Sequence, residues 1–122
     1  MANKQGYAKV TFDGEEKLLR FDMNGMADLE EHFDKGITAL MDKNRMGFST
    51  IRGLYWSGLK WKMQGLTFEK VGNMLQRKME EEDVTLAELM EPIKKAIEAA
   101  GWIKVRKTDT ETEQQEETDE KN

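Results

Sequence analysis

The first regular pattern along the chain is an alternation of apolar and polar residues near the N-terminus. Residues 7–12 alternate in this way, Asp13-Gly14 is a pair that tolerates the positive φ angles of a tight turn, and residues 17–21 resume the extended pattern. We therefore expect a β-hairpin over residues 7–22. Because a two-stranded hairpin is only marginally stable in water, its apolar side must pack on other elements; that side consists of Val10, Phe12, Leu19 and Phe21.

From residue 24 onward the apolar residues recur with the period of an α-helix. Asn24 is expected to cap a first helix, whose apolar residues include Met26, Leu29 and Phe33. The strongest helical pattern runs from about residue 48 to residue 63, behind a polar cap such as Ser49. Its expected core face is the stripe Phe48, Ile51, Tyr55 and Leu59.

Capping residues predict two further helices. Thr67 precedes a helix with the apolar residues Phe68, Val71, Leu75 and Met79. Thr85 and Glu88 form the signature of a capping box at the start of the last helix, which Gly101 is expected to close. Pro92 lies inside that last pattern, so we expect either a kink or two short helices there.

Together these patterns predict an α+β fold that is mainly α, with the N-terminal hairpin packed on a small bundle of four to five helices. Residues 1–107 form the expected single domain, with the helices within residues 24–101 and with Trp102, Ile103 and Val105 folding back onto the core. Residues 108–122 carry seven acids, one base and no apolar side chain, so we expect a disordered acidic tail.

Charge and composition narrow the function classes. The net charge is −5, but without the tail the body holds 17 acids and 18 bases, which argues against a clustered basic face for nucleic acid. Cysteine is absent, so no disulfide or thiolate site is available and a cytosolic location fits best. No stretch has the roughly 20 apolar residues that a membrane span needs.

The candidates for chemistry are few. His32 is the sole histidine, without a neighbouring serine or second histidine at a spacing that builds a triad or a metal site, so a helix-surface histidine is expected. The acids from Glu80 to Asp83 lack the spacing of a calcium loop, and none of the glycines forms a phosphate-binding motif. We therefore expect no catalytic residue, cofactor, metal or small-molecule substrate, and a protein that is not an enzyme.

Three residues of the strongest helical pattern are candidates for a partner interface. On a helical wheel Trp56, Trp61 and Met63 lie beside the core stripe, and Gly53 and Gly58 give this helix the mixture of small and large residues seen at packed crossings and interfaces. The alternative is that both tryptophans form the edge of the core. The nine methionines fill core gaps in most proteins, although methionine also suits surfaces that bind varied apolar partners.

The order of elements resembles the tail assembly chaperones of long-tailed bacteriophages and the related gene-transfer-agent tail proteins. The residues that carry this resemblance are Asn24-Gly-Met-Ala-Asp-Leu-Glu-Glu-His-Phe33, Ile51-Arg-Gly-Leu-Tyr-Trp-Ser-Gly-Leu59, Leu66-Thr-Phe-Glu-Lys-Val-Gly72 and Ala96-Ile-Glu-Ala-Ala-Gly101, after a short hairpin. It covers roughly residues 7–101 and rests on pattern and order.

The resemblance implies a homo-oligomeric helper in the host bacterial cytoplasm, absent from the mature virion. Such a helper binds the tape measure protein, and as a further partner the tail tube protein, and keeps the tape measure soluble until the tube polymerises around it. The family has no catalytic residues to transfer to this chain. Two alternatives stay open: a structural tail or head-tail component that remains in the virion, and a small DNA-binding regulator.

Overall fold

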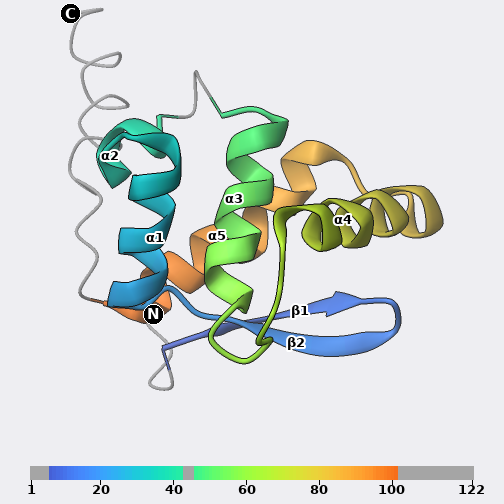
Figure 1. The fold of residues 1–122 in the computed structure, drawn as a ribbon. Helices are drawn as coiled ribbons and strands as arrows, with labels where there is room; N and C mark the ends of the chain where they lie inside the picture. Colours follow the sequence, from blue (N-terminus) through green and yellow to red (C-terminus); the bar gives the residue numbers. More distant parts are fainter. Residues whose placement is uncertain (1–5, 43–45, 102–122) are drawn as a thin grey trace, which may run out of the picture.

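The predicted hairpin is present and lies along one side of the helices (Figure 1). The computed structural model describes residues 6–42 and 46–101. Strand β1 (Ala8–Phe12) pairs with the antiparallel strand β2 (Glu15–Leu19), and Ala8 lies opposite Leu19. Asp13 and Gly14 connect the strands with φ angles of 54° and 77°, the two positive values that a type I′ turn requires.

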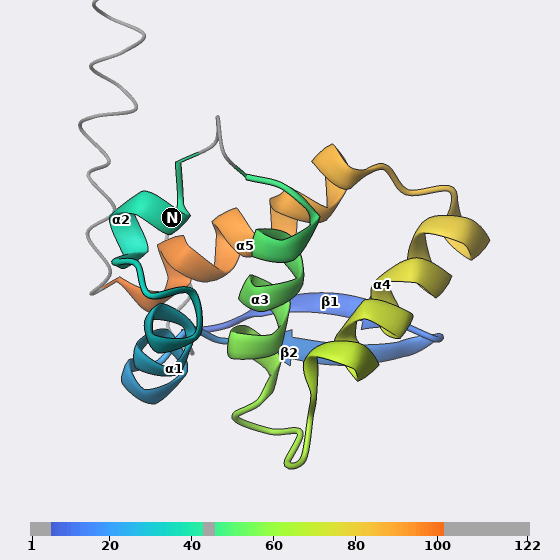
Figure 2. The ribbon, with the colours of Figure 1, turned by 45° about the horizontal axis from the view of Figure 1, so that its top comes forward.

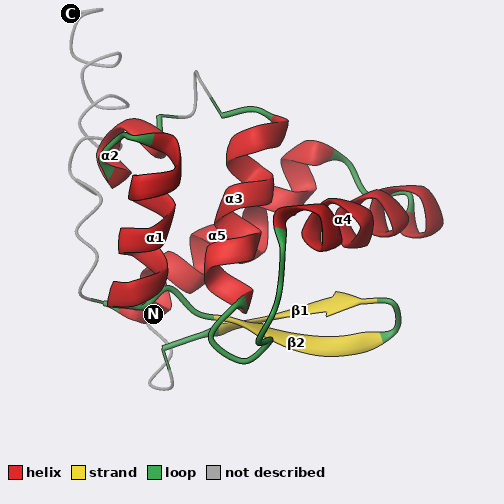
Figure 3. Ribbon diagram, in the orientation of Figure 1, coloured by secondary structure: helices red, strands yellow, loops and turns green. Residues whose placement is uncertain are grey.

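Within the described residues, five helices follow the hairpin (Figure 3). Their bounds are α1 (Met23–Phe33), α2 (Ile37–Leu40), α3 (Phe48–Leu59), α4 (Phe68–Glu82) and α5 (Leu86–Ala100). The fold is therefore α+β and mainly α, as predicted. The predictions for Trp102, Ile103, Val105 and residues 108–122 concern residues outside the described ranges.

Helix α3 is the central element. It contacts α1, α4, α5 and β2; in Figures 1 and 2, α1 and α4 lie on either side of it and α5 crosses behind it. The hairpin packs its inward face against α3 and α5. The residues predicted for the apolar side of the hairpin are all buried in the common core: Val10, Phe12, Leu19 and Phe21.

Two glycines of α3 allow its neighbours to approach closely. A Cβ atom at Gly53 would lie 2.7 Å from Phe33 Cε2, and one at Gly58 would lie 2.5 Å from Leu19 Cδ1. Real Cβ atoms do not approach carbon atoms this closely, so any larger residue at either position would require the Phe33 or the Leu19 side chain to shift. These glycines of α3 therefore serve packing within the domain: Gly53 at the crossing with α1, and Gly58 at the contact with β2.

The predicted caps of the last two helices are confirmed. The Thr67 side chain accepts a hydrogen bond from the Lys70 backbone N–H at 3.1 Å, and Thr85 and Glu88 form a reciprocal capping box. Gly101 follows α5 with a φ of 75°. Pro92 lies within α5, which is one uninterrupted helix, so the prediction of two short helices is wrong.

Other boundaries differ from the predictions. The cap of α1 is Asp22, whose carboxylate accepts from Gly25 N–H at 2.8 Å, and α3 follows Gly47 without a side-chain cap. Phe48 was expected in the core but is 73% exposed, because it is the first residue of α3, at the end farther from the hairpin (Figure 1). Helix α3 also ends at Leu59 and does not reach residue 63.

Candidate functional site

The inward face of the hairpin changes from apolar to charged toward its tip. Residues directly opposite each other in an antiparallel pair share a face, so Lys17 joins Val10 and Glu15 joins Phe12 on the side that faces the helices. Charged side chains resist burial, and here Lys17 is half-buried and Glu15 is exposed. Apolar packing between the hairpin and the helices is therefore incomplete at these two charged positions, and a cleft opens beside the hairpin tip.

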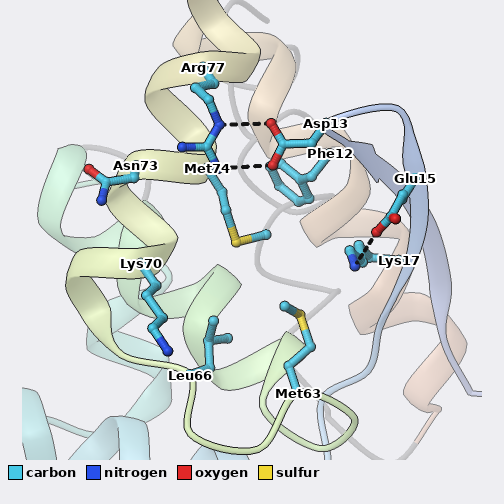
Figure 4. Close-up of a pocket in the computed structure, with 10 residues that line it drawn as sticks. All are labelled: Phe12, Asp13, Glu15, Lys17, Met63, Leu66, Lys70, Asn73, Met74 and Arg77. Carbon is cyan, nitrogen blue, oxygen red and sulfur yellow. Dashed lines mark hydrogen bonds and ion pairs between the residues drawn. The ribbon is translucent and has the colours of Figure 1, made fainter.

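This cleft lies between the hairpin tip, the turn that follows α3 and the first half of α4 (Figure 4). Its volume is about 340 Å³. Apolar side chains from three parts of the chain form its floor, namely Phe12, Met63, Leu66 and Met74. Charged and polar side chains form its walls, namely Asp13, Glu15, Lys17, Lys70, Asn73 and Arg77. A flexible, methionine-containing floor with a polar rim can accept an apolar side chain of varied shape.

An ion pair closes one end of the cleft by joining the hairpin turn to α4. Arg77 Nε donates to Asp13 Oδ1 at 2.8 Å, and Arg77 Nη2 donates to Asp13 Oδ2 at 2.9 Å. This two-pronged geometry fixes both side chains. The hydrogen bond from Arg77 holds the pKa of the Asp13 carboxyl below its ordinary value. The pair therefore sets the width of the cleft at this end while both groups are charged.

The three residues that the sequence proposed for a partner interface lie in different surroundings. Met63 lines the cleft. The Trp56 indole N–H donates to the Leu66 carbonyl at 3.0 Å, behind the cleft floor, and the Trp61 indole N–H donates to the Leu18 carbonyl at 3.0 Å. Trp61 and Met63 are in the turn after α3 and not on the helix. The helical-wheel prediction that placed all three on one helix is therefore wrong.

Trp56 belongs to an aromatic stack that crosses the outward side of α3. Its ring stacks on Phe68 with centroids 4.6 Å apart, and His32 stacks on Phe68 at 4.2 Å. Two cations lie over these rings: Lys60 Nζ is 4.6 Å from the Trp56 centroid, and the Arg52 guanidinium is 5.6 Å from that of Phe68. His32 is exposed, as expected for a helix-surface residue. The stack joins α1, α3 and α4, so Trp56 supports the architecture around the cleft.

Trp61 and Lys78 occupy the two open edges of the hairpin. Besides the bond from Trp61 to Leu18 on β2, the Lys78 ammonium donates to the Thr11 carbonyl on β1 at 2.5 Å. The Lys78 side chain is only 11% exposed. Unpaired carbonyls on a sheet edge invite pairing with other strands. These two side chains therefore protect the hairpin edges as well as attaching the hairpin to the helices.

Sequence reasoning missed most of the cleft residues. Lys70, Asn73 and Arg77 follow one another at helical spacing beside Met74, and this stripe was available as a signal. Charges at positions 15 and 17, on the inward side of a predicted strand, were a second signal. Neither pattern reveals that the two walls face each other, because that depends on how the hairpin packs on α4.

Comparisons with protein-family models, with curated proteins and with solved structures find no match for this chain. In residues 6–42 and 46–101, no group of three or more histidine and acidic side chains is placed to hold a metal ion. Across the same residues, none of the helices has both the length and the apolar character of a membrane span.

Proposed function

We propose that this chain is a non-catalytic phage tail assembly chaperone, which binds the tape measure protein and keeps it soluble for tail tube polymerisation. The observation that carries this proposal is the open, methionine-containing cleft between the hairpin tip and α4. A tape measure protein is a long helical chain with an apolar stripe, and such a helix binds by placing apolar side chains in a groove. In this role the chain acts as a homo-oligomer in the host cytoplasm and is absent from the mature virion.

The arrangement of the elements supports this proposal. The segments that carry the resemblance contribute to α1, α3, the start of α4 and the end of α5, behind a hairpin. This is the order of a short β element followed by helices that the resemblance implies. Two floor residues of the cleft lie at or beside these segments: Met63 is in the turn between Ile51–Leu59 and Leu66–Gly72, and Leu66 begins the second of them.

The test is co-expression with the long, helix-rich protein encoded just downstream, followed by affinity capture and measurement of the soluble fraction of that protein. Met63→Glu places a charge in the cleft floor at a half-buried turn position, and it is expected to reduce the captured complex at least several-fold. Phe48→Ser is the matched control, because it removes an exposed apolar side chain that does not line the cleft. Circular dichroism must show that both variants are folded.

Three outcomes would contradict the proposal or its site. If the downstream protein is neither captured nor solubilised by the wild-type chain, the chaperone function is wrong. If the chain is present in purified particles, it is a structural tail component instead. If Phe48→Ser abolishes capture and Met63→Glu does not, then the cleft is not the surface that binds.

A further inference from the structure

The walls of the cleft contain one more positively charged side chain than negatively charged ones. The walls contain three cations and two anions. Arg77 pairs with Asp13, and Lys17 Nζ pairs with Glu15 Oε1 at 3.0 Å. Among the described residues, the ammonium group of Lys70 has no ion-pair partner. Lys70 is therefore the cation of this cleft that is free to meet a negative charge on a bound molecule.

The position of Lys70 is set by the start of α4. Its backbone N–H donates to the capping hydroxyl of Thr67 at 3.1 Å, which fixes the residue in the first turn of the helix. From there its side chain extends along one wall toward Leu66, beside the apolar floor that includes Met63 and Met74 (Figure 4). A molecule that fills the floor would thus have Lys70 at its flank.

We propose that the cleft binds an amphipathic helix of the partner protein by two adjacent contacts. A large apolar side chain enters the floor at Met63, Leu66 and Met74, and an acidic side chain one turn away on the same helix pairs with Lys70. This inference rests on the proposed function and deepens it, because it makes Lys70 the residue that selects which segments of the partner are bound. Residues three or four apart on a helix lie on one side, so a single helix can make both contacts.

The chain's own acidic tail is a weaker candidate for this cleft. Residues 108–122 offer seven carboxylates for Lys70, but they contain no apolar side chain for the floor. Burying the apolar floor requires an apolar partner group, since only the removal of apolar surface from water gives the hydrophobic gain. A partner helix that carries both an apolar and an acidic side chain can contact the floor and Lys70 at the same time.

The test uses the full chain and two labelled synthetic peptides of about 18 residues, which is five turns of helix. Both carry the same Leu/Met stripe; the flanking positions hold glutamate in one and lysine in the other. Fluorescence anisotropy at about 0.15 M salt, where the Debye length is near 8 Å and the net charge of −5 is largely screened, is expected to show that the glutamate peptide binds about two- to fivefold more tightly, the range for an exposed ion pair. In about 1 M salt, where the Debye length is near 3 Å, the preference should disappear.

Variants assign the preference to one residue. Lys70→Gln should remove it, and Lys70→Glu should reverse it in favour of the lysine peptide. Lys95→Gln is the matched control, since it changes an exposed helix lysine of α5 that does not line the cleft, and it should leave the preference unchanged. Met63→Glu should weaken the binding of both peptides, because it disturbs the shared apolar contact.

The inference is overturned if neither peptide binds, if both bind equally to the wild-type chain, or if the preference survives in Lys70→Gln. It is also overturned if a synthetic copy of residues 108–122 displaces the peptide as effectively as unlabelled peptide does, which would assign the cleft to the tail. Loss of peptide selectivity while the co-expressed partner is still captured and solubilised rejects only the role of Lys70. Failure of the wild-type chain to capture and solubilise the co-expressed partner rejects the proposed function.

Discussion

Ser57 shows how a single polar atom can lower the stability of this domain. It is fully buried in α3, and its hydroxyl has no hydrogen-bond partner among the described residues. A buried polar group without a partner costs about 1–3 kcal/mol relative to one that is satisfied. The Ser57 carbonyl also lies close to Gly25, so α1 and α3 are packed closely at this position.

We therefore predict that Ser57→Ala raises the free energy of unfolding by about 1 kcal/mol. The substitution removes the unsatisfied hydroxyl and introduces the best helix former. Urea denaturation measures the change. Ser49→Ala, at an exposed position of the same helix, is the control and should alter stability by less than about 0.5 kcal/mol. A loss of stability in Ser57→Ala would mean that the hydroxyl is hydrogen-bonded in the folded domain.

At the scale of elements, the sequence predicted those features whose signals are local. The turn pair Asp13-Gly14 and the caps Thr67 and Thr85 define their elements within a few residues. The end of α3 was not predictable in this way, because residues 60–63 keep a helical pattern. There the hydrogen bond from Trp61 to Leu18, which joins residues 43 apart, accompanies a turn that the local pattern does not signal.

The cleft was not predictable from the sequence for the same reason, because it depends on contacts between distant segments. Met63 was selected from the sequence for a helix position that it does not occupy, and it lies in the candidate site because of the turn. Phe12 and Met74 reach the site from a strand and from α4. A surface built from segments so far apart in the chain exists only after those segments have packed, so no short window of sequence contains it.

Replacement of two helix glycines by alanine should change the free energy of unfolding in opposite directions. A Cβ atom at Gly25 would lie 2.7 Å from the Ser57 carbonyl oxygen, a backbone atom that can move only if α1 and α3 separate. At Gly72 the nearest atom is Arg52 Cδ at 3.5 Å, an ordinary contact. We predict that Gly25→Ala lowers the free energy of unfolding by about 1–3 kcal/mol. Gly72→Ala should raise it by up to about 1 kcal/mol through helix propensity.

Thermal and urea unfolding of the two variants provide the measurement, each variant acting as the control for the other. If Gly25→Ala were as stable as the wild-type domain, the close approach of α1 to α3 at Ser57 would be wrong. If Gly72→Ala were destabilised, its surroundings would be tighter than the structure describes.

At the scale of the whole molecule, Tyr55 connects three elements. From α3 its hydroxyl donates to the Leu89 carbonyl of α5 at 2.6 Å, and its ring meets Phe12 of β1 edge-on with centroids 5.5 Å apart. Burial raises the pKa of the Tyr55 phenol above its ordinary value of 10.0. As pH rises through that value, the unfolded chain loses this proton while the folded domain keeps it, so stability is fully present below pH 10.0 and declines above it.

We accordingly predict that the free energy of unfolding falls between about pH 9 and pH 11, and that Tyr55→Phe reduces the slope of this fall. Lysine titration contributes equally to both proteins, so the difference between the slopes isolates Tyr55. At about pH 8 the variant should be less stable by about 1 kcal/mol, because the hydrogen bond to Leu89 is lost. Equal slopes would show that the phenol titrates alike in the folded and unfolded chain.

The contact between β1 and α5 has a consequence for the order in which the domain can be completed during synthesis. The hairpin emerges before the helices, yet part of the surface against which β1 packs comes from the last described helix, Leu86–Ala100. At roughly 5–20 residues per second, about 4–18 s separate the translation of Phe12 from that of Ala100. A lone hairpin is only marginally stable in water. The hairpin therefore reaches its full packing only after α5 has left the ribosome, and folding of the domain is completed at that stage.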